Sequence, residues 1–270
     1  MFLLEDIGRG DATSRAVVPV GVRAKGVLLA RNELVASGLE IAGEVFALAD
    51  PGSVWTPLAS EGDRVAPGSR IAEVSGGARG LLAGERVALN LLQRMSGIAT
   101  ETRRYVEAVR GTAARILDTR KTVPGLRALD KQAVVAGGGT NHRFGLDDGI
   151  LIKDNHVAIA GGVAAAVASA RLRAPFGLRI EVEVESEGQL REALESGADL
   201  LLLDNRTPAE ASRLVALARG LAPRVQIEAS GNVSLANVRA YADAGVDFIS
   251  IGALTHSVRA SDVSLEFELG

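Results

Sequence analysis

Two stretches of this chain share one pattern, 48 residues apart: a helix, a glycine, and an aspartate that is followed at once by an apolar strand. They cover residues 190–204 and 238–252, and they match by identity at the glycine (Gly197 and Gly245) and at the aspartate (Asp199 and Asp247). A recurring unit of this kind indicates a repeated α/β architecture. Strand–loop–helix units from about residue 113 onward therefore predict a parallel sheet or barrel covered by helices, with a helper domain before it.

Cations follow two successive strands of the predicted barrel. The apolar run 114–117 leads into Thr119, Arg120 and Lys121, and the run 149–152 leads directly into Lys153. Ligands of α/β sheets and barrels lie at the carboxyl ends of the strands. The chain therefore directs several positive charges at one site, which indicates a substrate rich in anionic groups.

The strand predicted over residues 179–185 alternates strictly, with Glu181, Glu183 and Glu185 on one face and valines on the other. If the valines contact the surrounding helices, the glutamates point into the barrel, where buried carboxylates need cations or a metal ion. The alternative is an edge strand with one solvent-exposed face.

Small residues stand at the ends of the last two strands, where backbone N–H groups can bind a phosphate. They are Ser230, Gly231 and Asn232 after one strand, and Gly252 and Ala253 after the other. A glycine at a strand end is also a common turn residue. From the residues alone, we expect an enzyme that acts on a phosphorylated and carboxylated small molecule.

The composition of the chain excludes several classes of function. The 270 residues contain no cysteine, which excludes disulfides and thiol chemistry, and a net charge of −3 with 3% aromatic residues gives no support for a nucleic-acid partner. No apolar run approaches the roughly 20 residues of a membrane span. The first residues lack a basic leader, so we expect a cytoplasmic protein. Residues 3–19 read as a helix end followed by a loop, and residues 60–75 as a hairpin-rich sheet.

Long motifs spread over nearly the whole chain resemble quinolinate phosphoribosyltransferase, a type II phosphoribosyltransferase. These are EDIGRGDAT at 5–13, GERVALNLLQRMSGIAT at 84–100, DTRKTVPGLR at 118–127, GGGTNHRFGL at 137–146, IKDNH at 152–156, EVEV at 181–184, LLDN at 202–205, SGN at 230–232 and IGALTHS at 251–257. The family usually carries a further helical turn before the first motif, which bears on dimer contacts. The resemblance implies an N-terminal α/β open-sandwich domain over residues 1–94, joined by 258–270, and an incomplete, seven-stranded α/β barrel over 95–257.

The implied reaction transfers phosphoribosyl from phosphoribosyl pyrophosphate (PRPP) to quinolinate with decarboxylation. It gives nicotinate mononucleotide for NAD biosynthesis, with pyrophosphate and CO₂. The implied partners are these two substrates, Mg²⁺ carried with PRPP near Glu183 and Asp204, and a second copy of the chain in a homodimer with the active site at its interface, or in a hexamer.

The resemblance also implies a role for each matched position. The catalytic residues would be Lys121, Glu183 and Asp204. Quinolinate would be bound by Arg86, which the family donates across the dimer interface, and by Thr119, Arg120, His142, Arg143 and Lys153. The phosphates of PRPP would be bound by Lys121, Ser230, Gly231, Asn232, Gly252 and Ala253. His156 and His256 are expected to be structural.

Three other functions fit parts of the sequence. A Schiff-base lyase would use Lys153, since barrel aldolases keep their lysine at a strand end. The molybdenum-transport-associated branch of the same superfamily would lack the full NHR and IKDNH motifs, which are complete here. A carrier-like binding module built on residues 60–75 would need an exposed lysine in its hairpin, and this segment has none.

Overall fold

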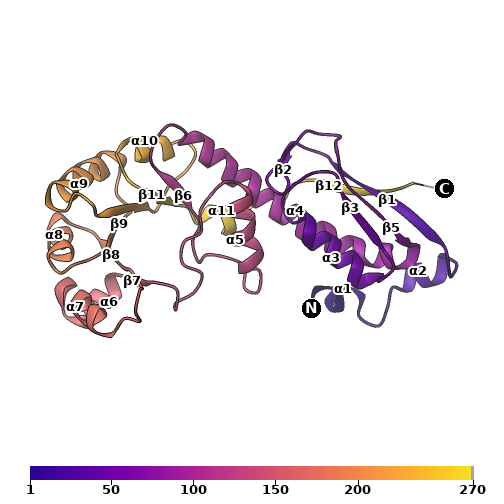
Figure 1. The fold of residues 1–270 in the computed structure, drawn as a ribbon, viewed down its shortest axis with the longest axis horizontal. Helices are drawn as coiled ribbons and strands as arrows, with labels where there is room; N and C mark the ends of the chain where they lie inside the picture. Colours follow the sequence, from indigo (N-terminus) through magenta and orange to yellow (C-terminus); the bar gives the residue numbers. More distant parts are fainter. Residues whose placement is uncertain (269–270) are drawn as a thin grey trace. The chain divides into compact units, whose positions relative to one another are not determined.

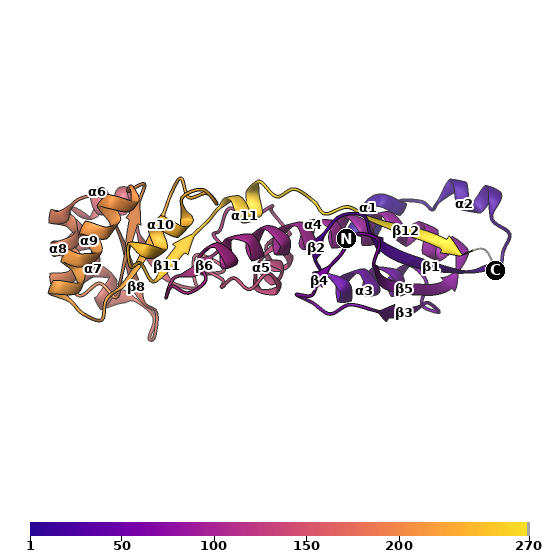
Figure 2. The same cartoon turned by 90° about the horizontal axis from the view of Figure 1, so that it is seen from above.

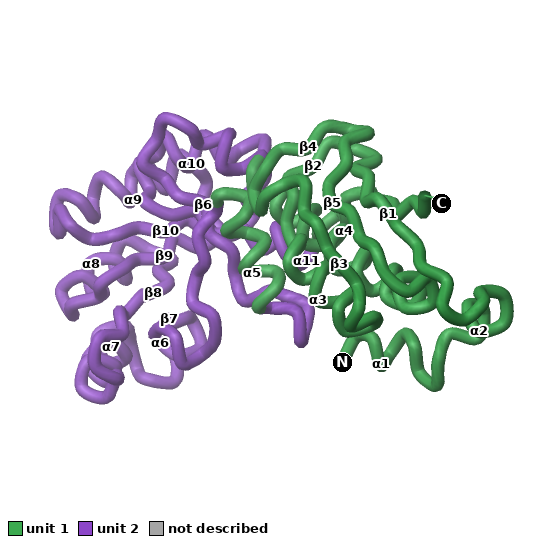
Figure 3. Tube along the Cα trace, turned by 45° about the vertical axis from the view of Figure 1, so that its right-hand side comes forward, with its two compact units in different colours: residues 1–103, 128–138, 257–270 green, residues 104–127, 139–256 purple. Residues whose placement is uncertain are grey.

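The computed structural model describes residues 1–268, and the chain divides into two compact units (Figure 3). Unit 1 comprises residues 1–103, 128–138 and 257–270, and unit 2 comprises residues 104–127 and 139–256. The long helix α4 (Ala78–Ala108) runs through residues 94 and 95, where the sequence places a domain boundary. Within residues 1–268, no helix combines the length and apolarity needed to cross a bilayer.

Unit 1 is built on an antiparallel sheet with the strand order β12-β1-β5-β3. Its strands are β12 (Val263–Glu268), β1 (Arg23–Ala30), β5 (Arg70–Gly77) and β3 (Val54–Pro57), and a two-stranded ribbon joins β2 (Leu34–Val35) to β4 (Arg64–Val65). Helix α3 (Leu39–Ala49) packs on β3 and β5, and the rings of Phe46 and Trp55 stack there with their centroids 5.8 Å apart. The segment after residue 262 thus returns to complete the first sheet.

The N-terminal segment differs from its prediction. Residues 3–19 hold two short helices, α1 (Phe2–Ile7) and α2 (Ala12–Val17), rather than one helix end and a loop. Asp11 is the N-cap of α2, since its Oδ1 accepts the backbone N–H of Ser14 at 3.0 Å. The Asp-Ala-Thr sequence therefore begins a helix where a loop was expected.

Unit 2 is a parallel sheet with the order β7-β8-β9-β10-β11-β6, and helices α7 to α10 lie along its outer side (Figures 1 and 2). The strands are β6 (Arg115–Leu117), β7 (Ile150–Ile152), β8 (Ile180–Val184), β9 (Leu200–Asp204), β10 (Gln226–Ser230) and β11 (Phe248–Ser250). The helices are α5 (Arg127–Ala136, mostly in unit 1), α6 (Asp154–Ala160), α7 (Val163–Arg173), α8 (Glu187–Glu195), α9 (Pro208–Leu221), α10 (Val238–Asp243) and α11 (Ala253–His256).

The described sheet of unit 2 has six strands, whereas the resemblance implies seven. Beyond β6, Thr140 makes one isolated parallel bridge to Leu117, and the chain around it does not continue as a strand. Three glycines at 137–139 precede this bridge, and glycine disfavours extended pairing.

The sequence repeat has a clear physical basis. Asp247 precedes β11, and its Oδ2 accepts from Arg219 of α9 at 2.6 Å and from the backbone N–H of Ile227 at 2.8 Å. Asp199 precedes β9 in the same way and accepts from Arg171 of α7 and from Ile180 N–H. Each aspartate thus joins the start of its strand to a covering helix and to the neighbouring strand. The preceding glycines, at 197 and 245, have φ values of 88° and 90°, which favour glycine.

Strand β8 lies between β7 and β9, and all five of its residues are buried. The edge-strand alternative is therefore wrong. Val182 and Val184 belong to the hydrophobic core together with buried residues of the helices, so the buried Glu181 and Glu183 point to the opposite, inner side. Glu185 lies beyond the end of β8 and is exposed, so two of the three glutamates are interior.

Candidate active site

A cavity of about 550 Å³ opens at the carboxyl ends of the strands of unit 2. This volume suits a small-molecule ligand. The predicted site residues in its lining are Thr119, Arg120 and Lys121 after β6, His142 and Arg143 before β7, Lys153 after β7, Asp204 at the end of β9, and Ser230, Gly231 and Asn232 at the end of β10. The chain thus brings residues from five segments to one concave site.

Four predicted residues lie outside the lining of this cavity. Arg86 belongs to unit 1, where its exposed side chain is 4.0 Å from Glu85. Glu183 is buried behind Lys153, and its Oε2 accepts from Nζ of that lysine at 2.6 Å. Gly252 lies under the side chain of Lys121, because a Cβ atom at Gly252 would be 2.9 Å from Cδ of the lysine. Ala253 is the first residue of α11.

The loop that carries Lys121 is held in place by neighbouring elements. The hydroxyl of Thr255, on α11, donates to the carbonyl oxygen of Lys121 at 2.9 Å, and Thr119 Oγ1 accepts the Lys121 N–H at 3.1 Å. Lys153 is anchored at its backbone, since its N–H donates to Nδ1 of His156 at 2.9 Å at the start of α6. His156 thus has a capping contact.

The two arginines of the cavity have different surroundings. Arg143 donates from Nη1 to the carbonyl oxygen of Gly149 at 2.8 Å, and burial together with the nearby charge of Arg120 lowers the pKa of Arg143. The Nε atom of Arg120 is buried and has no hydrogen-bond partner among residues 1–268. A buried donor of this kind favours an acceptor supplied by a ligand, and a carboxylate is the acceptor that pairs best with a guanidinium.

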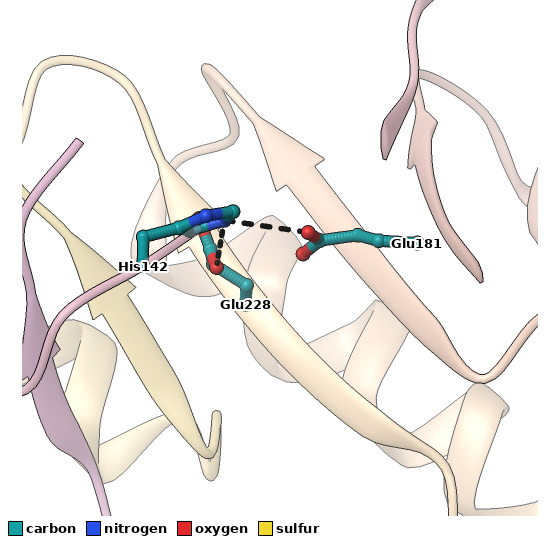
Figure 4. Close-up of side chains that lie close together, drawn as sticks. All are labelled: His142, Glu181 and Glu228. Carbon is teal, nitrogen blue, oxygen red and sulfur yellow. Dashed lines mark ion pairs between the residues drawn. The ribbon is translucent and has the colours of Figure 1, made fainter. Parts of the chain in front are cut away.

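His142, which lines the cavity, lies between two buried glutamates from β8 and β10 (Figure 4). Its Nε2 is 3.3 Å from Oε2 of Glu181 and 3.4 Å from Oε2 of Glu228. Burial acts to lower the pKa of His142, but the hydrogen bonds and charges of the two carboxylates outweigh it and raise the pKa to about 10. Burial and the charge of Glu228 raise the pKa of Glu181.

The other ring nitrogen of His142 is also engaged. Nδ1 accepts the backbone N–H of Arg143 at 2.7 Å, so in this geometry the ring carries its proton on Nε2, toward the glutamates. The pKa of about 10 for His142 and the raised pKa of Glu181 therefore describe the coupled cluster as a whole, which holds a proton more tightly than an isolated imidazole would.

One group of residues and one single carboxylate have the ligand types that hold a metal ion. His142, Glu181 and Glu228 have the right ligand types within 4.8 Å of one another, but a proton on Nε2 leaves no lone pair there for a metal. The carboxylate of Asp204 lies in the cavity, and its oxygens are hard ligands of the kind that Mg²⁺ takes beside substrate phosphates. Asp204 therefore fits Mg²⁺, while Glu183 is already paired with Lys153.

Asp204 is oriented by a short chain of amides. Asn205 Nδ2 donates to Oδ2 of Asp204 at 2.6 Å, and Asn232 Nδ2 donates to Oδ1 of Asn205 at 3.0 Å. Both asparagines have positive φ values, 53° and 54°. A Cβ atom at Gly231 would lie 2.2 Å from Asn205 Oδ1, so this turn needs glycine where the two loops meet.

Sequence reasoning did not single out Glu228, Asn205 or Ser250, which also line the cavity. Glu228 could have been found, since it is the one charged residue of strand β10. Asn205 lies in a quoted motif but was not assigned a role. Ser250 gives no signal, because a serine at a strand end is ordinary.

The family models for quinolinate phosphoribosyl transferase match this chain over both parts, with the N-terminal domain model at residues 11–96 and the C-terminal domain model at residues 98–266. The chain is 45% identical over 269 residues to a probable nicotinate-nucleotide pyrophosphorylase [carboxylating] from Bacillus subtilis, covering 99% of this chain and 91% of that protein. It is 46% identical over 270 residues to the nicotinate-nucleotide pyrophosphorylase [carboxylating] from Mycobacterium leprae, covering 98% and 94%.

The fold agrees with these sequence matches. The crystal structure of NadC from Streptococcus pyogenes superposes with a TM-score of 0.93 at 40% identity, covering 99% of this chain and 94% of that one. Matches over both domains and nearly the full length, together with a cationic cavity at the strand ends, lead to one conclusion: the chain belongs to the quinolinate phosphoribosyl transferase family.

Proposed function

We propose that this protein transfers the phosphoribosyl group of PRPP to quinolinate with decarboxylation, in the de novo synthesis of NAD. The products are nicotinate mononucleotide, pyrophosphate and CO₂. The observation that carries this proposal is the convergence of Arg120, Lys121, Arg143 and Lys153 on one cavity, with a buried guanidinium donor in need of an acceptor. A substrate with two carboxylates beside a substrate with several phosphates matches that charge.

Quinolinate is bound through its carboxylates by Arg120, Arg143 and Lys153, with Thr119 beside them. Arg120 and Arg143 offer planar forks that suit a carboxylate, and Lys153 is held by Glu183 in a fixed position at the rim. Both nitrogens of His142 have partners within the protein, so this residue supports the arginine loop, and its own part in binding quinolinate stays a prediction.

PRPP occupies the side of the cavity formed by the ends of β9 and β10. Backbone N–H groups at Ser230, Gly231 and Asn232, with Gly252 and Ala253 next to Lys121, are suited to the 5′-phosphate. Asp204 and Glu183 stabilise the positive charge that develops on the ribose when the bond from C1′ to the pyrophosphate oxygen breaks, and Lys121 offsets the negative charge of the leaving group.

The pyridine nitrogen then bonds to C1′ and the ring becomes cationic. That ring accepts the electron pair of the breaking carbon–carboxylate bond as CO₂ leaves, and a proton restores the carbon. No side chain need act as a nucleophile. Mg²⁺, held with PRPP at Asp204, supplies charge neutralisation for the phosphates. The residues of the chain bind and orient the two substrates and exclude water.

Three further features belong to this proposal. The protein forms a homodimer in which Arg86 of one copy completes the site of the other, as the family resemblance implies, and the dimers assemble further in a hexamer if the chain follows its hexameric relatives. The protein acts in the cytoplasm. The segment around Thr140 takes the place of the seventh barrel strand, which its bridge to Leu117 supports.

The decisive experiment measures nicotinate mononucleotide formed from PRPP and Mg²⁺ with quinolinate, in parallel with nicotinate as acceptor. Nicotinate lacks the second carboxylate, so turnover is expected with quinolinate alone. Equal turnover of both acceptors would contradict the assignment of the carboxylate-binding residues. The family assignment already disfavours a Schiff-base lyase that uses Lys153 and a carrier module.

A further inference from the structure

Two buried carboxylates have no role in the proposed reaction: Glu228, which lines the cavity, and Glu181, which contacts His142 beside it. Glu181 is 6% exposed and Glu228 is 2% exposed, and they come from strands β8 and β10, which lie on either side of β9. The Oε1 atom of each is buried and makes no hydrogen bond within the described chain. Burial of two like charges is costly, so their presence needs a compensating interaction.

That interaction is the shared contact with His142. Both carboxylates approach the same ring nitrogen, at 3.3 Å and 3.4 Å, while the opposite nitrogen accepts the backbone N–H of Arg143 at 2.7 Å. The backbone of His142 is fixed as well, because its N–H donates to Oδ1 of the buried Asp118 at 2.7 Å. The ring is therefore held on both sides and at its own backbone.

The fixed position of the His142 ring in turn fixes Arg143, the next residue in the chain. The direction of its backbone is set by the hydrogen bond to the ring, and its guanidinium is set by the hydrogen bond to Gly149 O. If the ring turns or shifts, the Arg143 N–H loses its acceptor and the arginine moves relative to Arg120. A displacement of about 1 Å in a binding group can lower a rate a hundredfold.

We propose that Glu181 and Glu228 are positioning residues for quinolinate binding: they jointly accept the Nε2 proton of His142 and so lock the ring that orients Arg143. This inference rests on the proposed function of the cavity. The charged groups around the imidazole are Glu181 from β8, Glu228 from β10, Asp118 from the end of β6, and Arg143 on the same loop. Glu181 and Glu228 also offset the positive charge of the arginines above them.

The test compares Glu181→Gln, Glu228→Gln and the double variant with Glu185→Gln. Each single change removes one negative charge, but the exposed Glu185 stands beyond β8 and outside the cavity lining. In the double variant, neither amide can accept the proton with the strength of a carboxylate. We expect KM for quinolinate to rise about tenfold or more in the double variant, with KM for PRPP changed less than about twofold, and both constants unchanged in the control.

A further variant separates positioning from general loosening of the fold. His142→Gln keeps a donor that reaches the glutamates but removes the acceptor for Arg143 N–H, so it should raise KM for quinolinate in the same selective way. Melting temperatures identify any glutamate variant that does not fold. The comparison with Glu185→Gln then uses His142→Gln in place of that variant. The assignment would be overturned if KM rose equally for quinolinate and PRPP. It would also be overturned if KM for quinolinate stayed normal in both the double variant and His142→Gln.

The unaltered protein gives the reference. If it makes no nicotinate mononucleotide, the proposed function fails and this inference fails with it. If the unaltered protein is active and the glutamine variants keep their affinity for quinolinate, the positioning role alone is refuted.

Discussion

Arg143 and Lys121 are the residues at which the loss of a single charge should be most visible. Both line the cavity, and both are held by hydrogen bonds: Arg143 by the His142 ring and the Gly149 carbonyl oxygen, and Lys121 by the Thr255 hydroxyl on α11. Replacing either by alanine should lower the rate of nicotinate mononucleotide formation roughly a hundredfold or more, because a preorganised charge is lost.

The matched control is Arg213→Ala, which removes an exposed cation on α9 that pairs with Glu187 at 3.4 Å. Steady-state assays with quinolinate should find this variant close to the unaltered protein. Near-normal turnover in both Arg143→Ala and Lys121→Ala would remove the site assignment.

The cluster around His142 should make stability depend on pH. Its folded pKa of about 10 lies above the value of about 6.5 expected in the unfolded chain. The folded state therefore binds the proton more tightly, so the stabilisation is fully present below about pH 6.5 and is lost as the pH rises toward 10.

Urea unfolding between pH 6 and 10 should accordingly give a falling free energy of unfolding. In Glu228→Gln one of the carboxylates that raise the pKa is gone, so the fall should be shallower than in Glu185→Gln. Parallel pH curves for these two variants would contradict a shared proton in the cluster.

Single-residue prediction from sequence worked where chemistry and position both gave a signal. The sequence could place three cations at the cavity, Arg120, Lys121 and Lys153. Each follows closely after an apolar strand, and the carboxyl ends of parallel strands form the binding edge of the sheet. His142 could be predicted near the site, but its partners could not, since both glutamates come from strands whose register only the folded sheet defines. Lys153 was a candidate partner for the inward glutamates, but the sequence did not indicate which glutamate it pairs with, for the same reason.

At the scale of elements, the repeated aspartates should contribute to stability in the same way. Asp247→Ala removes the acceptor of the Ile227 N–H and one of the two acceptors of Arg219, which also donates to Val225 O. Asp199→Ala does the same to Ile180 and to Arg171, which also donates to Gly197 O. Each change should lower the free energy of unfolding by about 1–3 kcal/mol, since a partly buried donor loses its hydrogen bond.

A suitable comparison is Asp243→Ala. That aspartate pairs with Arg239 one turn away on α10, and both side chains are 55% exposed, so its loss should cost less than about 0.5 kcal/mol. Urea titration of the three variants measures the difference. Equal values for Asp243→Ala and Asp247→Ala would show that the strand-start aspartates have no special role.

The repeat was evident in the sequence because glycine and aspartate each have a specific structural role at the start of a strand. Strand β8 was recognisable by its alternation, but its interior place in the sheet was not, because a strand with one charged face also suits an edge. Helix α2 was missed, since six residues give too little periodicity to outweigh a turn-like start at Asp11. The seventh strand was an expectation from the family, and only one bridge of it forms.

At the scale of the whole molecule, the cavity and Arg86 raise a question about assembly. The lining described above comes from unit 2 alone, whereas Arg86 belongs to unit 1. If Arg86 serves the site of a second copy, two inactive variants should restore one another when mixed. Arg86→Ala removes the donated cation and Lys121→Ala disables the receiving cavity, so each homodimer has two defective sites.

A mixed dimer of these variants has one site with both defects and one site with neither. After dissociation and random reassociation, about a quarter of all sites should therefore be intact, because half of the dimers are mixed and each has one good site. Activity of about that level in the mixture, with only the residual activity of about a hundredth in either variant alone, would support a site shared between copies. Arg143→Ala mixed with Lys121→Ala is the control: both residues belong to one cavity, so every site keeps a defect and no activity should return. If the Arg86 mixture also stays inactive although subunits exchange, Arg86 acts within its own chain or not at all.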